Sequence, residues 1–340
     1  MKKKISIKDI AQAAGVSTAL VSYVLNDKEK EARVGKEIAI KIREIARELN
    51  YQPNQIAKSL KSGKSHTIGL IVADISNPFF ANLARTIEDE AKKNNYTVIF
   101  GSSDENSDKS ADLIDVLINR QVDGFIIAPT ENSEKQIRYL ESQNIPLVLI
   151  DRYFPDINTS YVVTDNFQAS YDAVRHLIQT GHKKIGMLAY KSNLIHMQER
   201  KQGYIEAMQD SGLLAGDSLI KEISHSNIRK DVEIGINELL RNKPPVDALF
   251  FASNTLAISG LKFLDRHNYR IPEDLAVVCF DEGDAFDFFY SPLTFINQPL
   301  VEVGKEAVSI LIDQIKNNTN SNKRRLSISS ELVIRKSSGA

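Results

Sequence analysis

The chain has 340 residues, which is longer than one ordinary domain and suits two or three. Hydrophobic residues make up 42% of it, enough for real cores, but no run approaches the roughly 18 consecutive apolar residues of a membrane span. The formal charge is only −1, yet residues 1–65 hold 14 Lys and Arg against 7 Asp and Glu. This local excess favours a nucleic-acid partner for the N-terminal part, although a solvated basic surface would look similar.

Residues 5–26 predict two short helices joined by a tight turn. Ser6 stands three residues before Asp9, the spacing of a capping box at a helix start. Gly15 would end the first helix in a left-handed conformation, and Ser17 would cap the second. The apolar side chains fall on one face of each helix, and they are Ile7, Ile10, Ala11, Ala14, Leu20, Val21, Val24 and Leu25.

The outer face of the second helix is left with Thr18, Ala19, Ser22 and Tyr23. A DNA-reading helix-turn-helix carries its major-groove contacts on such a face, so we interpret residues 5–26 as this motif. A helical hairpin without a nucleic-acid role is the alternative.

A third helix is predicted over 36–49 and would close the headpiece core. Its apolar stripe consists of Ile38, Ile42, Ile45, Ala46 and Leu49. Pro53 bars helix continuity, and Asn54 can cap a further helix that reaches Lys61. That segment is about two turns long, too short to hold as an isolated helix in water, so we expect order there only when something packs on it. A plain linker is the alternative.

From Thr67 onward, short apolar runs alternate with helical stretches, the pattern of parallel α/β sheets. The strands are predicted near 67–73, 96–101, 122–128, 145–151, 184–189, 219–223, 247–251 and 275–280. The helices are predicted near 79–94, 107–120, 132–143, 166–180, 196–211, 229–241 and 255–267. Two successive series of this kind predict two lobes with a cleft between them.

Ligands of open α/β sheets bind beyond the carboxyl ends of the strands, where this sequence places Asp74, Asp151 and Asp281. A carboxylate and a guanidinium can together hold vicinal hydroxyl groups, and a phenylalanine face stacks on a sugar ring or a flat base. A small polyhydroxylated ligand fits this chemistry. Phe79 and Phe80 could instead belong to the core, and Arg152 could instead form a salt bridge between the lobes.

Two long segments, IKDIAQAAGVSTALVSYVLN and YQPNQIAKSLKSGKSHTIGLIVADISNPFF, resemble the LacI/GalR family of bacterial transcriptional regulators. The likeness continues through IPLVLIDR, TGHKKIGML, Glu199 to Tyr204, IPEDLAVVCFDE and SPLTFINQP, so it spans nearly the whole chain. It implies an α/β protein with a helix-turn-helix headpiece (1–53), a hinge helix and linker (54–65), and a two-lobed periplasmic-binding-protein-like core of parallel sheets (66–340).

The resemblance also implies where the chain crosses between the lobes, namely near Thr164, Asn297 and Arg325. The first lobe would contain about 66–163 and 298–324, with a helix over 300–316. The second lobe would contain about 164–297 and 325–340, and the strand Leu326–Arg335 would finish there.

The resemblance implies two sets of site residues. The DNA-binding set is Ser6, Ser17, Thr18, Ala19, Ser22, Tyr23, Asn26, Asn54, Ala57, Leu60 and Lys61. The effector-binding set is Asp74, Phe79, Phe80, Asp151, Arg200, Asn254 and Asp281. In the family, paired hinge helices enter the minor groove, where a leucine matching Leu60 opens a base step.

Two positions depart from the family pattern. Position 23 is usually arginine, which contacts guanine through two hydrogen bonds, whereas Tyr23 offers one hydroxyl and an apolar ring. Position 254 is commonly aspartate and here is Asn254. We therefore expect an atypical operator and an altered pattern of recognised hydroxyl groups.

We expect a ligand-gated transcriptional regulator, most simply a repressor, that binds a near-palindromic operator as a homodimer and needs no cofactor or metal. An enzyme is one alternative, but the sequence lacks G-x-S-x-G, a metal-ligand cluster and a G-x-G-x-x-G after a strand. A transport-associated sugar-binding protein is another, but it gives no reason for residues 5–61. Lys8 and Asp9 interrupt any export signal, so we expect a cytoplasmic protein. Cys279 lies among apolar neighbours and is expected in the core.

Overall fold

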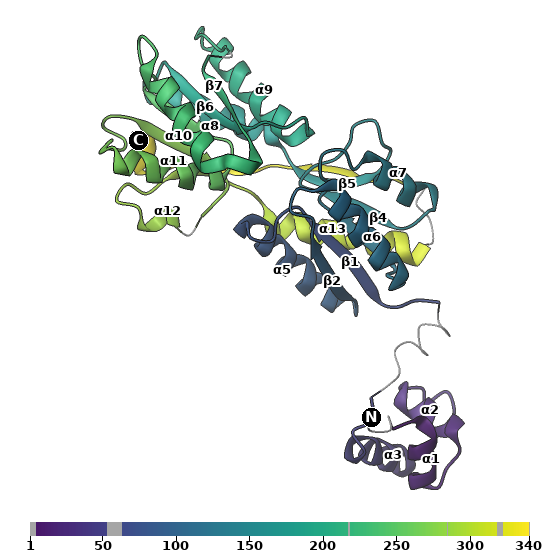
Figure 1. Cartoon of the computed structure of the whole chain (residues 1–340). Helices are drawn as coiled ribbons and strands as arrows, with labels where there is room; N and C mark the ends of the chain where they lie inside the picture. Colours follow the sequence, from purple (N-terminus) through teal and green to yellow (C-terminus); the bar gives the residue numbers. More distant parts are fainter. Residues whose placement is uncertain (1–4, 53–62, 217, 284, 318–321, 340) are drawn as a thin grey trace. The chain divides into compact units, whose positions relative to one another are not determined.

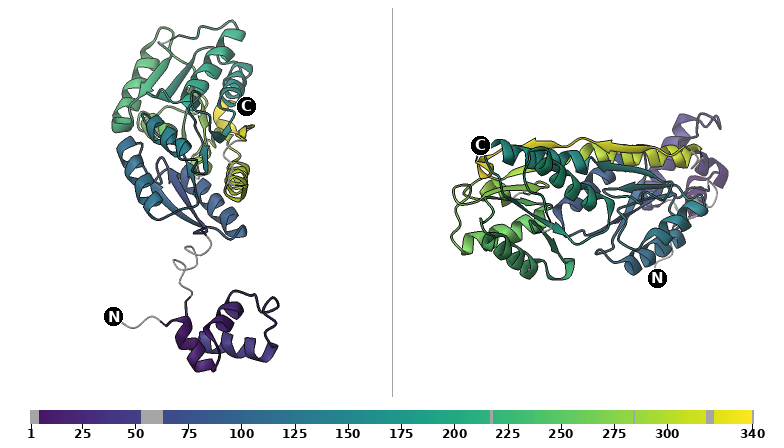
Figure 2. Two further views of the ribbon diagram at one scale, coloured as in Figure 1. Left: turned by 90° about the vertical axis from the view of Figure 1, so that its right-hand side faces the viewer. Right: turned by 90° about the horizontal axis from the view of Figure 1, so that it is seen from above.

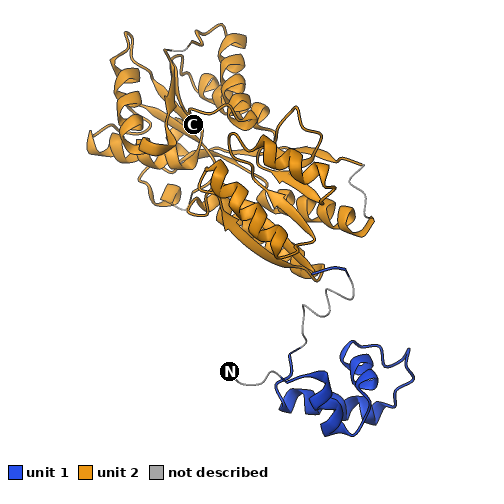
Figure 3. Ribbon diagram, turned by 45° about the vertical axis from the view of Figure 1, so that its right-hand side comes forward, with its two compact units in different colours: residues 1–65 blue, residues 66–340 orange. Residues whose placement is uncertain are grey.

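The computed structural model describes residues 5–52, 63–216, 218–283, 285–317 and 322–339. The chain divides into two compact units, residues 1–65 and residues 66–340 (Figure 3). The hinge residues Asn54, Ala57, Leu60 and Lys61 lie outside the described residues, so the predicted hinge helix stays a prediction.

The described residues of the first unit form three helices, α1 (Ile7–Ala14), α2 (Thr18–Leu25) and α3 (Lys36–Glu48). Gly15 has φ +71°, the left-handed conformation expected between α1 and α2. The buried core is Ile10, Ala11, Ala14, Val21, Val24, Ala39, Ile42 and Ala46. Ile38 was expected on the buried stripe of α3 but is exposed. The helix instead turns Ala39, Ile42 and Ala46 inward, which lie three and four residues apart on one face.

The second unit contains two six-stranded sheets, one in each lobe. The first has the order β11-β5-β4-β3-β1-β2 and the second has the order β12-β10-β9-β8-β6-β7. The strands of the first sheet are β1 (Thr67–Val72), β2 (Thr97–Ser102), β3 (Gly124–Ile127), β4 (Leu147–Ile150), β5 (Ser160–Thr164) and β11 (Arg325–Ile328). Those of the second are β6 (Ile185–Tyr190), β7 (Ile220–Ile223), β8 (Ala248–Phe251), β9 (Ala276–Phe280), β10 (Thr294–Asn297) and β12 (Glu331–Val333).

Helices cover both sheets (Figure 1). The first lobe has α5 (Pro78–Lys93), α6 (Ser107–Asn119), α7 (Glu134–Ser142) and α13 (Leu300–Asn317). The second has α8 (Asn166–Gln179), α9 (Ile195–Asp210), α10 (Ile228–Arg241), α11 (Asn254–Arg266), the short α12 (Ala285–Phe288) and the 3-10 turns η1 (His225–Asn227) and η2 (Lys336–Ser338). Every predicted helix and strand from 67 to 280 begins and ends within two residues of its expected position. Among the described helices, none has the length and apolar character needed to cross a membrane.

The lobes are joined by three crossings, between β5 and α8, between β10 and α13, and between β11 and β12. Figure 2 (right) shows the yellow C-terminal segments running along one side of both lobes. The third crossing was expected near Arg325, with one strand over Leu326–Arg335 in the second lobe, and this expectation is wrong. β11 pairs in parallel with β5 of the first sheet, and β12 pairs antiparallel with β10 of the second. The chain changes sheets between Ile328 and Glu331 because each sheet offers it an unpaired edge.

Candidate functional site

The exposed face of α2 is the candidate DNA-binding surface. Thr18, Ala19 and Tyr23 are exposed, and Tyr23 has 44% of its surface accessible. Ser22 is half-buried beside them. Val21 and Val24 on the opposite face are fully buried in the headpiece core. One face of α2 therefore packs on the other helices, and the other face is exposed to solvent.

The remaining headpiece residues of the expected DNA-binding set are at helix ends. Ser6 donates its backbone N–H to Asp9 Oδ2 at 2.7 Å, as a capping box requires. The Ser17 hydroxyl accepts a hydrogen bond from the backbone N–H of Leu20 at 3.2 Å. Asn26 donates its side-chain amide to the Ser22 carbonyl at 2.7 Å. All three capping residues stay exposed, so these bonds leave them accessible to a phosphate backbone.

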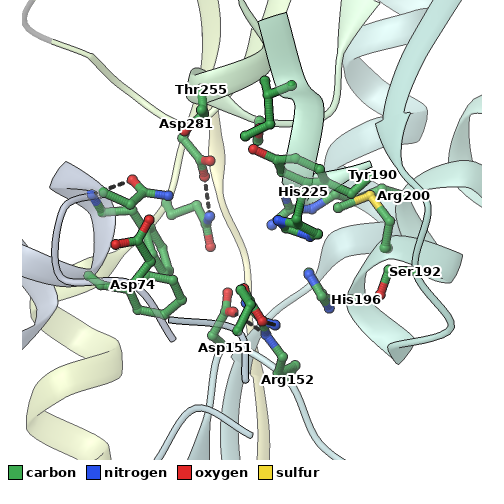
Figure 4. A pocket seen from close by; sticks show the side chains of 18 of the residues that line it. Asp74, Asp151, Arg152, Tyr190, Ser192, His196, Arg200, His225, Thr255 and Asp281 are labelled. Carbon is green, nitrogen blue, oxygen red and sulfur yellow. Dashed lines mark hydrogen bonds and ion pairs between the residues drawn. The ribbon is translucent and has the colours of Figure 1, made fainter. Parts of the chain in front are cut away.

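The second candidate site is a cavity of about 230 Å³ between the two lobes, at the carboxyl ends of strands from both sheets (Figure 4). Six of the seven expected effector residues line it, namely Asp74, Phe79, Phe80, Asp151, Arg200 and Asp281. The other lining residues are Asn77, Asp104, Glu105, Arg152, Tyr190, Ser192, His196, Met197, His225, Ile228, Ser253, Thr255 and Gln298. The cavity is therefore polar, with carboxylates on both lobes.

Asn254 is the expected effector residue that does not line this cavity. It begins α11 and is buried, and its Nδ2 lies 3.3 Å from Asn77 Oδ1 of the first lobe and 3.5 Å from the Glu282 carbonyl. Its neighbours Ser253 and Thr255 line the cavity instead. In this structure Asn254 joins the two lobes at the edge of the site.

Arg152 is held entirely by carboxylates of its own lobe. Its Nη1 and Nη2 donate to the two oxygens of Glu105 at 2.9 and 3.0 Å, and its Nε donates to Asp151 at 2.9 Å. Burial opposes the charge of Arg152, but these carboxylates raise its pKa above the ordinary value. The pKa of Glu105 is lowered by Arg152 in spite of burial. The alternative that Arg152 forms a salt bridge between the lobes is therefore wrong.

Arg200 is buried on α9 beside the ring of Phe280, with 3.5 Å between the guanidinium carbon and the ring centroid. Its Nε donates to Asn166 Oδ1 at 2.8 Å and its Nη1 donates to the Ala252 carbonyl at 2.7 Å. Burial lowers the pKa of Arg200. The stacked ring and the two hydrogen bonds fix the guanidinium in one orientation.

Asp151 and Asp281 occupy corresponding places in the two lobes. Each directly follows a central strand, β4 or β9, and each has a left-handed backbone, with φ +65° and +74°. Gln298 donates its side-chain amide to Asp281, and burial raises the pKa of that carboxyl. Aspartate tolerates this backbone region better than most residues, and such strained positions gather at functional sites.

Histidines and aromatic rings form one side of the cavity. Tyr190 and His225 stack at 3.9 Å between ring centroids, with 11° between their planes. His196 is buried, and its Nδ1 has no hydrogen-bond partner among the described residues. Burial, followed by the charges of Arg152 and Arg200, lowers the pKa of His196 well below its ordinary value, so the imidazole is neutral.

One of these additional residues could have been found from the spacing in the sequence. His196 lies four residues before Arg200 and therefore on the same face of a helix. Glu105, Ser192 and His225 follow strand ends through loops, and nothing in their spacing shows that the loops converge.

Comparison with known proteins supports the same division of the chain. A family model described as "Periplasmic binding proteins and sugar binding domain of LacI family" matches residues 65–336, and another, "Bacterial regulatory proteins, lacI family", matches residues 6–54. The chain is 31% identical over 335 residues to the HTH-type transcriptional repressor PurR of Haemophilus influenzae (strain PittEE), covering 98% of each. It is 33% identical over 332 residues to the ribose operon repressor of Haemophilus influenzae (strain ATCC 51907 / DSM 11121 / KW20 / Rd), again covering 98% of each.

Among solved structures, the complex of the transcriptional regulator CelR with cellobiose is similar, with a TM-score of 0.73 and 26% identity. The match covers 98% of this chain and 100% of that one. These relatives are named as regulators of transcription and not as enzymes. With both family models matched and relatives similar over nearly their full length, the chain belongs to the LacI family of bacterial regulatory proteins, with a helix-turn-helix DNA-binding domain followed by an effector-binding core.

Proposed function

We propose that the protein is a sequence-specific transcriptional repressor whose affinity for its operator is controlled by a small sugar-like effector. Residues 1–53 bind DNA, residues 54–65 connect, and residues 66–340 bind the effector and form a homodimer. The observation that carries the proposal is the presence, in one chain, of an exposed recognition-helix face and a polar cavity between two lobes. Because a bacterial repressor binds chromosomal DNA, we place the protein in the cytoplasm.

The α2 surface supports the DNA-binding part of the proposal. Thr18, Ala19 and Tyr23 leave the helix on the side away from its core, as base-contacting residues must. The basic excess of residues 1–65 supplies the attraction to phosphate.

The cavity supports the effector part. Asp151 and Asp281 approach it from opposite lobes, so a ligand with several hydroxyl groups could bind both at once. Phe79 and Phe80 meet edge to face, with 4.9 Å between centroids, and give an apolar surface on which a sugar ring can pack. A ligand that contacts both lobes favours one spacing of the lobes over another, which is the requirement for control at a distance.

The edge of the first sheet supports the homodimer. Among the described strands, β2 pairs with β1 alone, and its Ile99 and Phe100 are exposed, as is Val116 of α6. An uncovered edge strand with apolar side chains is a liability for a soluble protein, so a second copy covering this face would remove it. Two headpieces would then match two operator half-sites.

The test is selection of binding sites from a random DNA library with the full-length protein. We expect paired half-sites, and we expect Tyr23→Arg to redirect preference at one base pair per half-site by about 1–3 kcal/mol, since arginine can form two hydrogen bonds to guanine. Tyr139→Arg is the matched control, because Tyr139 is also an exposed tyrosine but lies on α7 of the second unit and not in the headpiece. If the native protein and Tyr23→Arg select the same motif, α2 does not read the bases.

A further inference from the structure

We propose that the short segment Ser192–Leu194, which links β6 to α9 of the second lobe, is a clasp. It docks on the first lobe and holds the two lobes closed before any effector binds. Glu131 of the first lobe and Leu194 carry this docking, and both act as positioning residues for α9. The inference rests on the proposed function only where it connects the clasp to control of operator binding.

The first observation is that the start of α9 has no side-chain cap of its own. The first four backbone N–H groups of any helix have no partner inside the helix. In α5, α6, α8 and α11 the N-cap side chain accepts one such hydrogen bond, and these residues are Asn77, Asn106, Asp165 and Ser253. The N-cap of α9 is Leu194, whose side chain cannot accept one, and the first turn of α9 has no acidic residue. The start of α9 therefore depends on groups outside the helix.

Glu131 supplies such a group from across the cleft. Its Oε1 accepts hydrogen bonds from the backbone N–H of Asn193 at 2.6 Å and from the Ser192 hydroxyl at 2.8 Å. The Ser192 oxygen in turn accepts the backbone N–H of Leu194 at 3.1 Å. The helix dipole also favours a carboxylate at this end of α9. Because Glu131 lies between β3 and α7 of the first lobe, this cap exists only while the lobes are in contact.

Leu194 adds an apolar contact to the same docking. It is only 5% exposed, although its place in the chain is between two elements of the second lobe. Its side chain belongs to the buried apolar cluster of the first lobe that also contains Phe154 and Ile157. Opening the lobes would expose this leucine to water and would break both hydrogen bonds of Glu131, so the docked clasp favours the closed form.

The clasp lies next to the effector cavity. Ser192 itself lines that cavity, and His196 and Arg200 follow on α9 (Figure 4). Because the clasp fixes the start of α9 on the first lobe, the distance from these side chains to Asp151 is set before a ligand arrives. A ligand that binds the closed form binds more tightly when more of the protein is already closed. The clasp therefore sets how readily the protein responds to its effector.

The first experiment measures the separation of the lobes in the full-length protein, without sugar or DNA. Arg138→Cys on α7 and Lys230→Cys on α10 place one exposed cysteine on each lobe, whereas the single native cysteine, Cys279, is buried. Spin labels on the two new cysteines report their distance by double electron–electron resonance. An excess of unlabelled protein ensures that a dimer carries one labelled pair. We expect one narrow distance in the native background.

The clasp is removed by the double substitution Glu131→Ala with Leu194→Ala. A minor conformation is commonly populated at about 0.1–10%. Loss of both contacts should raise the ratio of open to closed molecules by about a hundredfold, so that a second, longer distance appears. Glu131→Gln, which keeps an acceptor oxygen without the charge, should give less of the longer distance than Glu131→Ala. An unchanged distance distribution in the double variant overturns the proposal.

Two matched controls separate undocking from general damage. Glu134→Ala removes the other glutamate of the cavity of about 410 Å³ beside the clasp, whereas the hydrogen bonds of the clasp go to Glu131. Leu219→Ala truncates a leucine that is 4% exposed but packs in the core of its own lobe. It should lower the unfolding temperature and keep the narrow distance. A longer distance in either control would overturn the assignment to Glu131 and Leu194.

The second experiment tests the cap itself through hydrogen exchange of backbone amides. In Glu131→Ala, which alters a half-buried loop residue, the amides of Asn193 and Leu194 should exchange at least about tenfold faster than in the native protein. The first turn of α8 is the internal reference, because Asp165 caps it through the backbone N–H of Gln168. If both first turns change equally, or neither changes, Glu131 is not the cap of α9.

The third experiment connects the clasp to regulation. Sugar-free affinity for the DNA motif obtained by selection should differ from that of the native protein by about threefold or more in Glu131→Ala, and should be unchanged in Glu134→Ala. An unchanged affinity in a variant whose lobes have opened would overturn the role of the clasp in control. If no DNA motif is selected at all, the proposed function fails, whereas the distance measurement still decides whether the clasp holds the lobes closed.

Discussion

At the scale of single residues, Asp281 combines features that stability alone does not explain. It has a left-handed backbone, it is buried, and its carboxyl accepts a hydrogen bond from Gln298. Asp151 repeats the backbone conformation at the matching strand end of the other lobe. Each such backbone costs on the order of 1 kcal/mol, which a ligand bridging the two carboxylates would offset.

We expect Asp281→Asn to weaken effector binding by about 1.5–3 kcal/mol, the value of a hydrogen bond to a charged group. The same change should not harm the fold, because asparagine tolerates the left-handed region and can still accept the amide of Gln298. Calorimetric titration of both proteins with a sugar that raises the unfolding temperature of the native protein measures the loss. An equal affinity would mean that Asp281 does not contact the effector.

The pH dependence of stability gives an independent check on Asp281. Burial raises its pKa, with Arg200 opposing. A carboxyl with a raised pKa favours the folded state fully below its ordinary pKa, and this contribution is lost as pH rises through the raised value. The free energy of unfolding in urea should therefore shift in favour of Asp281→Asn as the pH rises above about 4, the ordinary pKa of an aspartate carboxyl. A difference that stays constant as the pH rises would contradict the burial of an ionisable carboxyl.

Site residues could be predicted from the sequence where they directly follow a strand. The contacts that these residues make were harder to predict. Asp74, Asp151 and Asp281 are recognisable because polar residues follow apolar strands. Asn254 follows the same rule, yet its side chain reaches Asn77 of the other lobe, a contact that depends on how the lobes meet. The buried bonds of Arg200 also require the structure, and they make alanine a poor test there, because Asn166 would lose its partner.

At the scale of elements, a chain of buried hydrogen bonds links the cavity to two of the three crossings. Arg200 binds Asn166, and the Asn166 amide donates to the Thr164 carbonyl at 2.9 Å. The Thr164 hydroxyl donates to Gln298 Oε1 at 2.6 Å. Gln298 in turn binds Asp281. Arg200 and Asp281 are thus connected through the crossing segments. A movement of one lobe relative to the other must change the backbone conformation of these segments.

Thr164→Val should reduce the factor by which the sugar changes operator affinity, while binding of the sugar itself stays within about threefold. Thr164 does not itself line the cavity, and the substitution removes one buried hydrogen bond, from Thr164 to Gln298, worth about 1 kcal/mol. Effector coupling is typically only about 1–3 kcal/mol. Operator affinity with and without saturating sugar measures this factor.

Thr164→Ser keeps the hydroxyl and should behave like the native protein. Thr180→Val is the matched control at the other end of α8, because the Thr180 hydroxyl bonds only to the His176 and Leu177 carbonyls. An unchanged factor in Thr164→Val would mean that the hydrogen-bond chain is static.

The elements themselves follow the periodicity of the sequence closely, and the exceptions are the segments that join the lobes. β5 and β10 were not predicted as strands, and the expected strand over Leu326–Arg335 is two short strands in different sheets. Local pattern indicates that a segment is extended, but its choice of sheet depends on which edge is unpaired. That information lies in residues more than 150 positions away, such as the pairing of Ser327 with Val163.

At the scale of the whole molecule, the exposed edge of the first sheet makes self-association testable. Phe100 of β2 is 60% exposed beside Ile99, with Val116 exposed on α6. We expect Phe100→Lys to shift the protein toward monomer and to lower operator affinity, because a buried lysine at a dimer interface is strongly unfavourable. Sedimentation equilibrium measures the shift.

Phe288→Lys is the matched control, since Phe288 is 90% exposed on α12 of the second lobe. It should leave the dimer unchanged. Equal dissociation of both variants, or of neither, would place the interface elsewhere.

The contacts between the lobes affect the rate at which a bound effector dissociates as well as its affinity. Asn254 meets Asn77 at the edge of the cavity, and Glu131 of the first lobe accepts hydrogen bonds from Ser192 and from the backbone N–H of Asn193 at 2.8 and 2.6 Å. We expect a bound molecule to leave when such contacts break, so that the opening rate of the protein sets how long the molecule stays bound. Different sugars of quite different affinity should then dissociate at similar rates and differ mainly in how fast they are captured. After the sugar is removed, the transcriptional response would then end at a rate that the opening of the protein sets and that is similar for every sugar.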